Sequence, residues 1–488
     1  MFGSALLFAF LPVAVSPEAE GVSSKGISSW IDTCERTIDS LHGFVLLRHG
    51  KVVAEGSWKP YDTLNEPHFL SSHTKCFVTT AIGMLADEGK IDLDERVLDI
   101  LKDKAPAKPS ENQRQVRVRD LLTMNFGAKE GDCRPHDLDR DWIAPILATD
   151  PERRPGELYS YDSGATHALG VIAARRAGMP LFEFLKKRLF DPLGIEKAWT
   201  TYDPEGNMCG AWGLHATTRE IALMGQFHLQ EGLWNGRRLL SRQWVQLATA
   251  KQTWSGESPT DRQEKNDWLQ GFGFNWWRCR HDCYRADGAG GQYTIVMPDQ
   301  DAVLSIHADV RDMQQVLDAV WDFVLPALKD APLAADESAA AALKARCASL
   351  ALKPVPGAKE GAKGGFYGRE FAFDKAPTGI RSVQLDETKN GWTLTMKTAG
   401  GVFALPVGFG EWKRDRMVFS ARKHQPLCDC VGVQPVVASG AVQTDGSLWV
   451  RVMLLNGPRK IDLVFKRKMF RPAVECEMLG LGKFSAKL

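Results

Sequence analysis

A serine and a lysine at a spacing of three, Ser72 and Lys75, form the first pair in this sequence that could do chemistry. They lie within residues 69–78 and open an apolar run with a helix-like pattern. Because residues three and four apart are neighbours on a helix, the two side chains can meet. Burial disfavours the charged form of a lysine, so Lys75 can accept the proton of Ser72. The pair predicts a nucleophile and its base; the alternative is an N-cap serine followed by a solvated lysine.

The Ser-x-x-Lys helix runs into Asp-Glu-Gly-Lys-Ile (87–91), and Val-Arg-Asp-Leu-Leu-Thr-Met (118–124) follows, with a glycine soon after. This pattern resembles the serine β-lactamase and penicillin-binding-protein superfamily. It resembles in particular the class C-like branch of esterases, β-lactamase-related hydrolases and 6-aminohexanoate-dimer hydrolases. The resemblance covers about residues 29–328 and implies an α+β fold, with an antiparallel sheet flanked by helices and an all-helical region between the first two motifs.

In this family a Pro-Gly turn precedes a Tyr-x-Asn motif, and here Tyr161 takes the tyrosine position and Ser163 the asparagine position. The resemblance implies that Tyr161 shares or relays the proton. Tyr159 competes for this role, because residues two apart on an extended segment point the same way. The distance to Ala-Leu-Gly (168–170) favours Tyr161, and the alternative is a core tyrosine bonded to a carbonyl. Serine in place of asparagine resembles the amide- and ester-cleaving members.

The family's third motif, Lys-Thr-Gly or His-x-Gly, corresponds to Ala286, Asp287 and Gly288, so its cationic first residue is absent. In β-lactamases and DD-peptidases that cation helps to hold a substrate carboxylate, and its loss argues against penicillin or peptidyl-D-alanine substrates. We expect the backbone N–H groups of Ala289 and Ser72 to stabilise an oxyanion. The alternative is a Gly-rich edge strand. Two orientations of Asp287 remain open: toward the pocket, where it would repel anions, or toward solvent.

Aromatic and cysteine residues mark the segment before this motif. Residues 268–278 are predicted to form an aromatic strand. The aromatic side chains from Phe272 to Trp277, with Trp212, could line an apolar acyl or alcohol pocket, and the alternative is that they belong to the core. Cys279 and Cys283 flank a predicted His-Asp turn, where a cross-hairpin disulfide, two free thiols and a metal site are the alternatives. Cys428 and Cys430 form a similarly lone pair.

Composition limits the classes of partner. The 488 residues are 44% hydrophobic and 25% charged, which is typical of soluble globular proteins, and 61 Lys+Arg balance 60 Asp+Glu. This balance gives no electrostatic footprint for nucleic acid or an acidic membrane, so a small substrate is expected. The apolar run at residues 5–15 is too short for stable membrane insertion. It predicts a signal for a periplasmic or secreted protein, with a cytoplasmic location as the alternative.

Four segments are expected along the chain. Residues 1–16 form an N-terminal or signal segment, and residues 24–330 the β-lactamase-like domain, which starts with a helix at 29–41 and a hairpin at 43–56. An Ala-rich helix (334–352) and a linker occupy residues 331–365. Residues 366–488 contain alternating stretches at 392–397 and 448–454 and look like a small lipocalin-like β-barrel.

The function predicted from these features is a serine hydrolase that forms an acyl-enzyme at Ser72 and cleaves carboxylic esters or small amides. The first alternative is a DD-peptidase or β-lactamase acting on cell-wall-like amides. The second is a catalytically inactive homologue that binds a peptide or glycan. Neither a metal nor an organic cofactor is implied, and the sequence does not indicate an oligomeric state.

Overall fold

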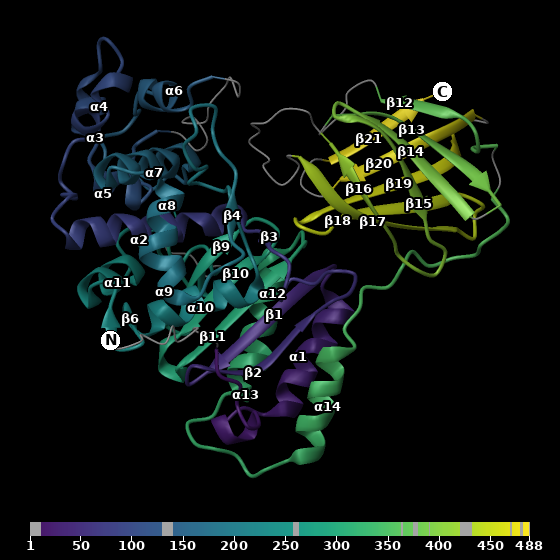
Figure 1. Ribbon diagram of the computed structural model, residues 1–488, viewed down its shortest axis with the longest axis horizontal. Helices are drawn as coiled ribbons and strands as arrows, with labels where there is room; N and C mark the ends of the chain where they lie inside the picture. The colour runs from purple at the N-terminus through teal and green to yellow at the C-terminus, as the bar shows by residue number, and fades with distance from the viewer. Residues whose placement is uncertain are drawn as a thin grey trace, which may run out of the picture. The chain divides into compact units, whose positions relative to one another are not determined.

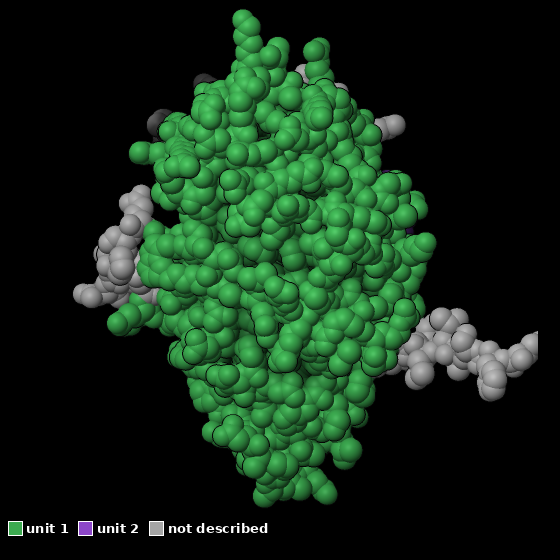
Figure 2. All heavy atoms as spheres, turned by 90° about the vertical axis from the view of Figure 1, so that its left-hand side faces the viewer, with its two compact units in different colours: residues 1–57, 63–307, 312–349 green, residues 58–62, 308–311, 350–488 purple. Residues whose placement is uncertain are grey.

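The computed structural model describes residues 11–128, 140–256, 263–362, 365–373, 379–389, 391–419, 432–468, 471–478 and 482–487. The chain divides into two compact units, which Figure 2 colours separately. The first unit comprises residues 1–57, 63–307 and 312–349, and the second comprises residues 58–62, 308–311 and 350–488. The mixture of helices and strands confirms the predicted α+β class (Figure 1).

A six-stranded sheet forms the centre of the first unit, in the order β2-β1-β11-β10-β9-β8. Its strands are β1 Leu41–Arg48, β2 Lys51–Ser57, β8 Trp277–Arg278, β9 Tyr284–Gly288, β10 Gln292–Met297 and β11 Ala302–Ala308. The pairs β1–β2, β10–β11, β9–β10 and β8–β9 are antiparallel. The β1–β2 turn has positive φ at both His49 (50°) and Gly50 (72°), as a tight primed hairpin turn requires.

Helices cover both faces of this sheet. On β10 the hydroxyl of Tyr293 donates to the carbonyl of Met313, the first residue of α12 (Met313–Ala319), at 3.1 Å. The next residue, Thr294, donates to the carbonyl of Ile221 in α10 (Thr218–Leu229) at 3.3 Å. Because neighbouring strand residues point to opposite faces, α12 and α10 lie on opposite sides. The helices α1 (Ser24–Thr37) and α14 (Glu337–Ala348) pack together, and α1 also contacts α12.

The helices between the first two motifs, α3 to α6, form the predicted helical region, and further helices of the first unit follow later in the chain. The helix α2 packs along α7, and α7 also contacts α5, α6 and α8. Every residue of α2 from Thr74 to Leu85 is buried, as expected for a core helix. The bounds are α2 Thr74–Asp87, α3 Val97–Ile100, α4 Glu111–Gln115, α5 Val118–Leu122, α6 Ile143–Ala148, α7 Ser163–Ala177, α8 Leu181–Leu185, α9 Asp191–Leu193, α11 Arg242–Thr249 and α13 Leu325–Ala327. The short strands are β3 His68–Phe69, β4 Trp199–Thr200, β5 Leu214–Ala216, β6 Leu233–Trp234 and β7 Arg237–Arg238.

The second unit contains a ten-stranded sheet in the order β15-β14-β13-β12-β21-β20-β19-β18-β17-β16. A parallel bridge between Gly408, just after β15, and Ser439 in β17 nearly closes it, which confirms the predicted small barrel. Buried apolar side chains, among them Phe371, Leu394 and Phe465, fill its interior. The bounds are β12 Glu370–Phe373, β13 Ile380–Thr388, β14 Gly391–Thr398, β15 Gly401–Val407, β16 Lys413–Val418, β17 Val433–Val442, β18 Leu448–Leu454, β19 Arg459–Lys468, β20 Arg471–Met478 and β21 Gly482–Lys487.

Local predictions differ from the structure at several elements. The aromatic strand predicted at 268–278 is wrong: only β8 is a strand, because Gly271 (φ 114°) and Asn275 (φ 59°) interrupt the extended backbone. The first helix begins at Ser24 and ends before the predicted boundary, since Leu41 already starts β1. The Ala-rich helix α14 is shorter than the predicted range 334–352, and it packs against α1 and β2.

Two predictions fall largely outside the described residues. They are the cysteine pair at 428 and 430 and most of the N-terminal apolar run, of which only residues from Leu11 onward are described. Within the described ranges, no helix is both long and apolar enough to span a bilayer.

Candidate active site

Ser72 lies in a tight 3-10 turn, Ser71–His73, that leads directly into α2. Two backbone hydrogen bonds of Leu70 stabilise the turn. The Leu70 N–H donates to the Leu214 carbonyl of β5 at 2.9 Å, and the His73 N–H donates to the Leu70 carbonyl at 3.2 Å. Ser71 has a φ of 52°, in the left-handed region that non-glycine residues seldom adopt. Backbone strain of this kind concentrates at functional sites, which makes the turn a candidate for the site's centre.

Lys75 connects this turn to the second predicted motif. Its side chain is buried, with a relative exposure of 2%. Its Nζ donates to Ser72 Oγ at 3.1 Å, to Ser163 Oγ at 3.3 Å and to the Ala211 carbonyl at 2.7 Å. The contact with Ser163 joins residues 88 apart in sequence, and it follows from the packing of α2 along α7.

Ser163 is the first residue of α7. The helix is capped by Asp162, whose carboxylate accepts the Ala165 N–H at 3.0 Å, and this leaves the Ser163 hydroxyl at the helix start. Asp162 was not singled out in the sequence, although an Asp followed by a helical run is a recognisable N-cap signal. The cap therefore fixes the position of a hydroxyl that contacts the lysine.

Tyr161 and Tyr159 both line the same cavity, as their extended segment predicts. The Lys75 Nζ lies 5.0 Å from the centroid of the Tyr161 ring, which places this tyrosine beside the lysine. Tyr161 stacks on Trp277, with centroids 5.9 Å apart and planes 20° apart, whereas Tyr159 meets Trp277 edge-on at 6.1 Å. The structure thus brings Ser72, Lys75, Tyr161 and Ser163 together.

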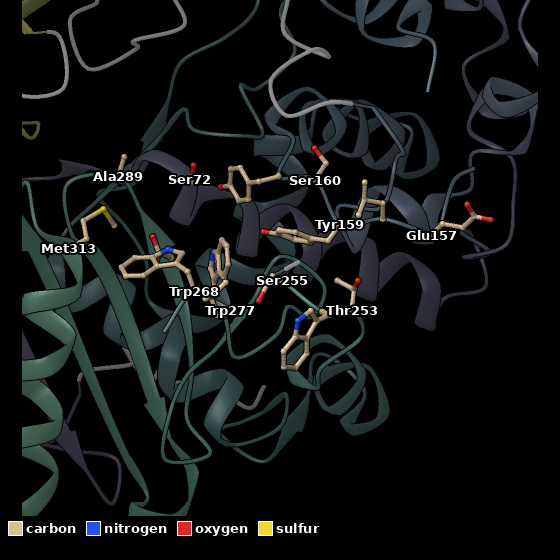
Figure 3. A pocket seen from close by; sticks show the side chains of 16 residues that line it. Ser72, Glu157, Tyr159, Ser160, Thr253, Ser255, Trp268, Trp277, Ala289 and Met313 are labelled. Carbon is tan, nitrogen blue, oxygen red and sulfur yellow. The ribbon is translucent and has the colours of Figure 1, made fainter. Parts of the chain in front are cut away.

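The third predicted motif forms the end of β9, and this strand contacts the Ser72 turn. Gly288 makes that approach possible, because a Cβ there would lie 2.1 Å from the Leu70 carbonyl oxygen. Ala286 is fully buried, while Asp287 and Ala289 line the cavity. Figure 3 shows Ser72 and Ala289 on the same side of it.

Asp287 has a partner that the sequence reading missed. Arg285, which shares a strand face with it, is completely buried and donates from Nε to Asp287 Oδ2 at 2.8 Å. Its Nη1 donates to the Asp267 carbonyl at 2.8 Å, and its guanidinium lies 4.6 Å from the Trp268 ring centroid. Burial raises the pKa of the Asp287 carboxyl, and the charges of Arg285 and Lys75 oppose that shift. Alternation along the strand was the available signal for this pair.

The cavity around these groups has a volume of about 750 Å³. Aromatic rings make up much of its wall, contributed by Tyr159, Tyr161, Trp254, Trp268 and Trp277. Among the aromatics predicted to line a pocket, Trp277 does so, and Phe272 packs behind Tyr159 and Trp277. Trp212 instead stacks near Trp142, with centroids 5.7 Å apart.

The Cys279–Cys283 segment is a turn, as predicted, with positive φ at His281 (59°) and Asp282 (53°). Both cysteines are free thiols in the structure, and burial raises the pKa of Cys279 to about 11. His281 points its ring toward Trp321, at 5.3 Å between centroids. In the described parts of the chain, no group of three or more His, Cys, Asp or Glu side chains is arranged to hold a metal ion.

Comparison with known proteins extends these observations. The profile of the family described as Beta-lactamase matches residues 35–329. The chain is 25% identical over 285 residues to the 6-aminohexanoate-dimer hydrolase of Paenarthrobacter ureafaciens, covering 54% of this chain and 70% of that protein.

Two solved structures are similar in fold. A penicillin-binding protein homologue from Caulobacter crescentus matches with a TM-score of 0.51 at 16% identity, over 64% of this chain and 99% of that one. EstCE1, a hydrolase with promiscuous acyltransferase activity, matches with a TM-score of 0.50 at 15% identity, over 62% of this chain and 99% of that one. The chain therefore belongs to the beta-lactamase family, within the serine β-lactamase and penicillin-binding-protein superfamily.

Proposed function

We propose that this protein is a serine hydrolase that cleaves carboxylic esters or small amides through an acyl-enzyme at Ser72. The observation that carries the proposal is the buried Lys75 amine, which contacts both the Ser72 hydroxyl (3.1 Å) and the Ser163 hydroxyl (3.3 Å) beside the ring of Tyr161. A nucleophile and a base within hydrogen-bond reach, with the base oriented by further groups, is the arrangement that activates a serine. The carbonyl of Ala211 fixes the amine from a third direction.

The proposed reaction has two halves, acylation and deacylation of Ser72. Ser72 Oγ attacks the substrate carbonyl carbon while Lys75 takes the hydroxyl proton, and the N–H groups of Ser72 and Ala289 stabilise the resulting oxyanion. Collapse of this intermediate breaks the bond to the leaving alcohol or amine, which receives the proton from Lys75 through Tyr161. Water then attacks the acyl-Ser72 ester with the same groups as base, which releases the acid and restores Ser72.

Features of the third motif favour esters and small amides over cell-wall peptides or penicillins. Ala286 replaces the cation of the family motif and is buried, so it offers no charge to a substrate carboxylate. The aromatic cavity suits an apolar acyl or alcohol group. The similar proteins include a 6-aminohexanoate-dimer hydrolase and the hydrolase EstCE1, consistent with amide or ester substrates.

The remaining assignments follow the same proposal. Residues 24–330 would be the hydrolase domain, residues 331–365 its terminal helix and linker, and residues 366–488 an accessory barrel. We also propose a periplasmic or secreted location on the basis of the N-terminal apolar run.

Hydrolysis assays on the wild type and Ser72→Ala test this function. The panel is p-nitrophenyl acetate and butyrate, the 6-aminohexanoate dimer, and nitrocefin as a β-lactamase substrate. We expect turnover of an ester or of the dimer, and a loss of about 10³-fold or more in Ser72→Ala, because no other group replaces the nucleophile. Ser29→Ala, an exposed serine on α1, is the matched control and should keep wild-type rates.

Two results would count against the proposal. Wild type and Ser72→Ala that are equally inert on the whole panel would favour a binding protein instead of an enzyme. Nitrocefin turned over faster than every ester and amide would move the assignment to the β-lactamase branch.

A further inference from the structure

Asp287 presents a carboxylate to the cavity from the strand that contacts the Ser72 turn. Its side chain is 7% exposed, and the residue lines the cavity. Its position is fixed along the chain, because the next residue, Gly288, packs against the Leu70 carbonyl. Among the described residues, Oδ2 accepts the hydrogen bond from Arg285 Nε and Oδ1 accepts none. One carboxylate oxygen is therefore left for a bound molecule.

Arg285 holds this carboxylate but does not offer its own charge to the cavity. The guanidinium is completely buried behind the wall, where it contacts Asp287, the Asp267 carbonyl and the Trp268 ring. Among the described residues that line the cavity, the charged ones are Asp287 and Glu157, and both are acidic. Figure 3 shows Glu157 at the far end of the cavity from Ser72 and Ala289. Of these two lining carboxylates, Asp287 is the one on the strand that contacts the Ser72 turn, and behind the wall the Lys75 amine lies against the Ser72 hydroxyl at 3.1 Å.

The family's third motif carries a cation, which favours substrates with a carboxylate. A carboxylate in the same motif favours the opposite substrate charge. Like charges that meet in a partly desolvated site repel, whereas a charge-assisted hydrogen bond from an ammonium is among the stronger polar contacts. The aromatic wall can pack against an apolar spacer between such an ammonium and the carbonyl that reacts.

We propose that Asp287 makes this site selective for esters or amides whose acyl part carries an ammonium group, and against those whose acyl part carries a carboxylate. This inference rests on the hydrolase function proposed above. Asp287 acts on the choice of substrate, and the chemical step stays with Ser72 and Lys75.

Three p-nitrophenyl esters of equal chain length test this in the wild type: the 6-aminohexanoate, the hexanoate and the adipate monoester. They differ only in an ammonium, a methyl or a carboxylate at the end of the acyl chain. We expect kcat/KM to fall in that order, with about 10-fold or more between the ammonium and carboxylate esters, since hydrogen bonds to charged groups have such strengths. A carboxylate ester cleaved as well as the ammonium ester would overturn the proposal without any variant.

The variant Asp287→Asn tests whether Asp287 causes this preference between substrates. The ratio of kcat/KM for the ammonium and carboxylate esters should drop by about 10-fold or more, because the formal charge is lost while the size is kept. Asp282→Asn changes the same charge at an exposed turn and should keep the wild-type ratio. Using ratios removes any general loss of activity caused by weakening the contact with Arg285.

Other outcomes distinguish a failure of the Asp287 selectivity from a failure of the hydrolase function. A wild-type ratio in Asp287→Asn, or a ratio abolished by Glu157→Gln alone, would overturn the role of Asp287. If the neutral hexanoate ester is cleaved only as fast by wild type as by Ser72→Ala, the hydrolase function itself fails. If that ester is cleaved at Ser72 but the wild type shows no charge preference, only the selectivity proposal fails.

Discussion

Replacing Lys75 with methionine should lower kcat/KM for the best ester or amide by about 10³-fold while the protein stays folded. Methionine keeps the length and apolar stem of lysine but cannot exchange a proton, and a positioned acid or base contributes about 10²- to 10⁴-fold. The substitution removes the hydrogen bonds of the Nζ atom to Ser72, Ser163 and the Ala211 carbonyl. Losing these hydrogen bonds lowers the free energy of unfolding. Part of that loss is offset, because the cost of burying a polar amine is removed as well.

Steady-state kinetics over a range of pH, together with thermal melting, check this result. Lys90→Met is the matched control, since Lys90 lies just beyond α2 and pairs with Glu88 at the surface. It should keep wild-type kinetics. Near-normal activity in Lys75→Met would exclude Lys75 as the base and direct attention to Tyr161, for which Tyr161→Phe is the corresponding variant.

A second large effect is expected in acid: the free energy of unfolding should fall steeply as the pH drops below about 6.5. Burial lowers the pKa of His68 and His228 to about 4 and that of His73 and His215 to about 3. Burial also lowers the pKa of His307 well below its ordinary value. The folded protein therefore keeps these five imidazoles neutral across a range in which the unfolded chain would protonate them.

Proton linkage gives the direction in which stability changes with pH. Above about pH 6.5 the histidines are neutral in both states and cost nothing. Between about pH 6.5 and 4 the unfolded state binds more protons, so stability is lost as the pH falls. Each histidine lowers the free energy of unfolding by up to about 1.4 kcal/mol per pH unit, and the five together by up to about 7 kcal/mol per pH unit. The loss over one pH unit is then comparable with the whole stability of a typical domain.

Denaturant unfolding at several pH values between 7.5 and 4.5 measures this effect. His215→Phe keeps an aromatic ring in the stack with Trp199, whose centroid lies 3.6 Å away, and should reduce the slope by up to about 1.4 kcal/mol per pH unit. His281→Gln, at the exposed turn, should leave the slope unchanged. A free energy of unfolding that stays constant down to pH 4.5 would contradict the prediction.

The sequence allowed the fold class to be predicted because local patterns and the family motifs point the same way. The spacing of Ser72 and Lys75 suffices for their contact, since both belong to one helical start. The meeting of Lys75 with Ser163 depends on the packing of α2 along α7, and only the resemblance indicated it. The assignments of Ser72, Lys75 and Tyr161 to catalysis stay predictions.

Other features could not be read from local patterns. The acceptor at Ala211 is a backbone carbonyl, which any residue type would provide. The strand predicted over 268–278 is wrong because the prediction relied on the aromatic residues and disregarded Gly271, whose φ is positive. Trp268 lines the cavity from a segment that is not a strand. The order of the ten barrel strands also depends on long-range pairing that alternation alone does not specify.

Intact-mass analysis after treatment with a fluorophosphonate, followed by peptide mapping, tests the central claim most directly. An activated Ser72 should give one adduct per chain, located on the peptide that contains residue 72, and Ser72→Ala should give none. A wild-type protein that remains unmodified, or an adduct that persists in Ser72→Ala, would contradict the acyl-enzyme account.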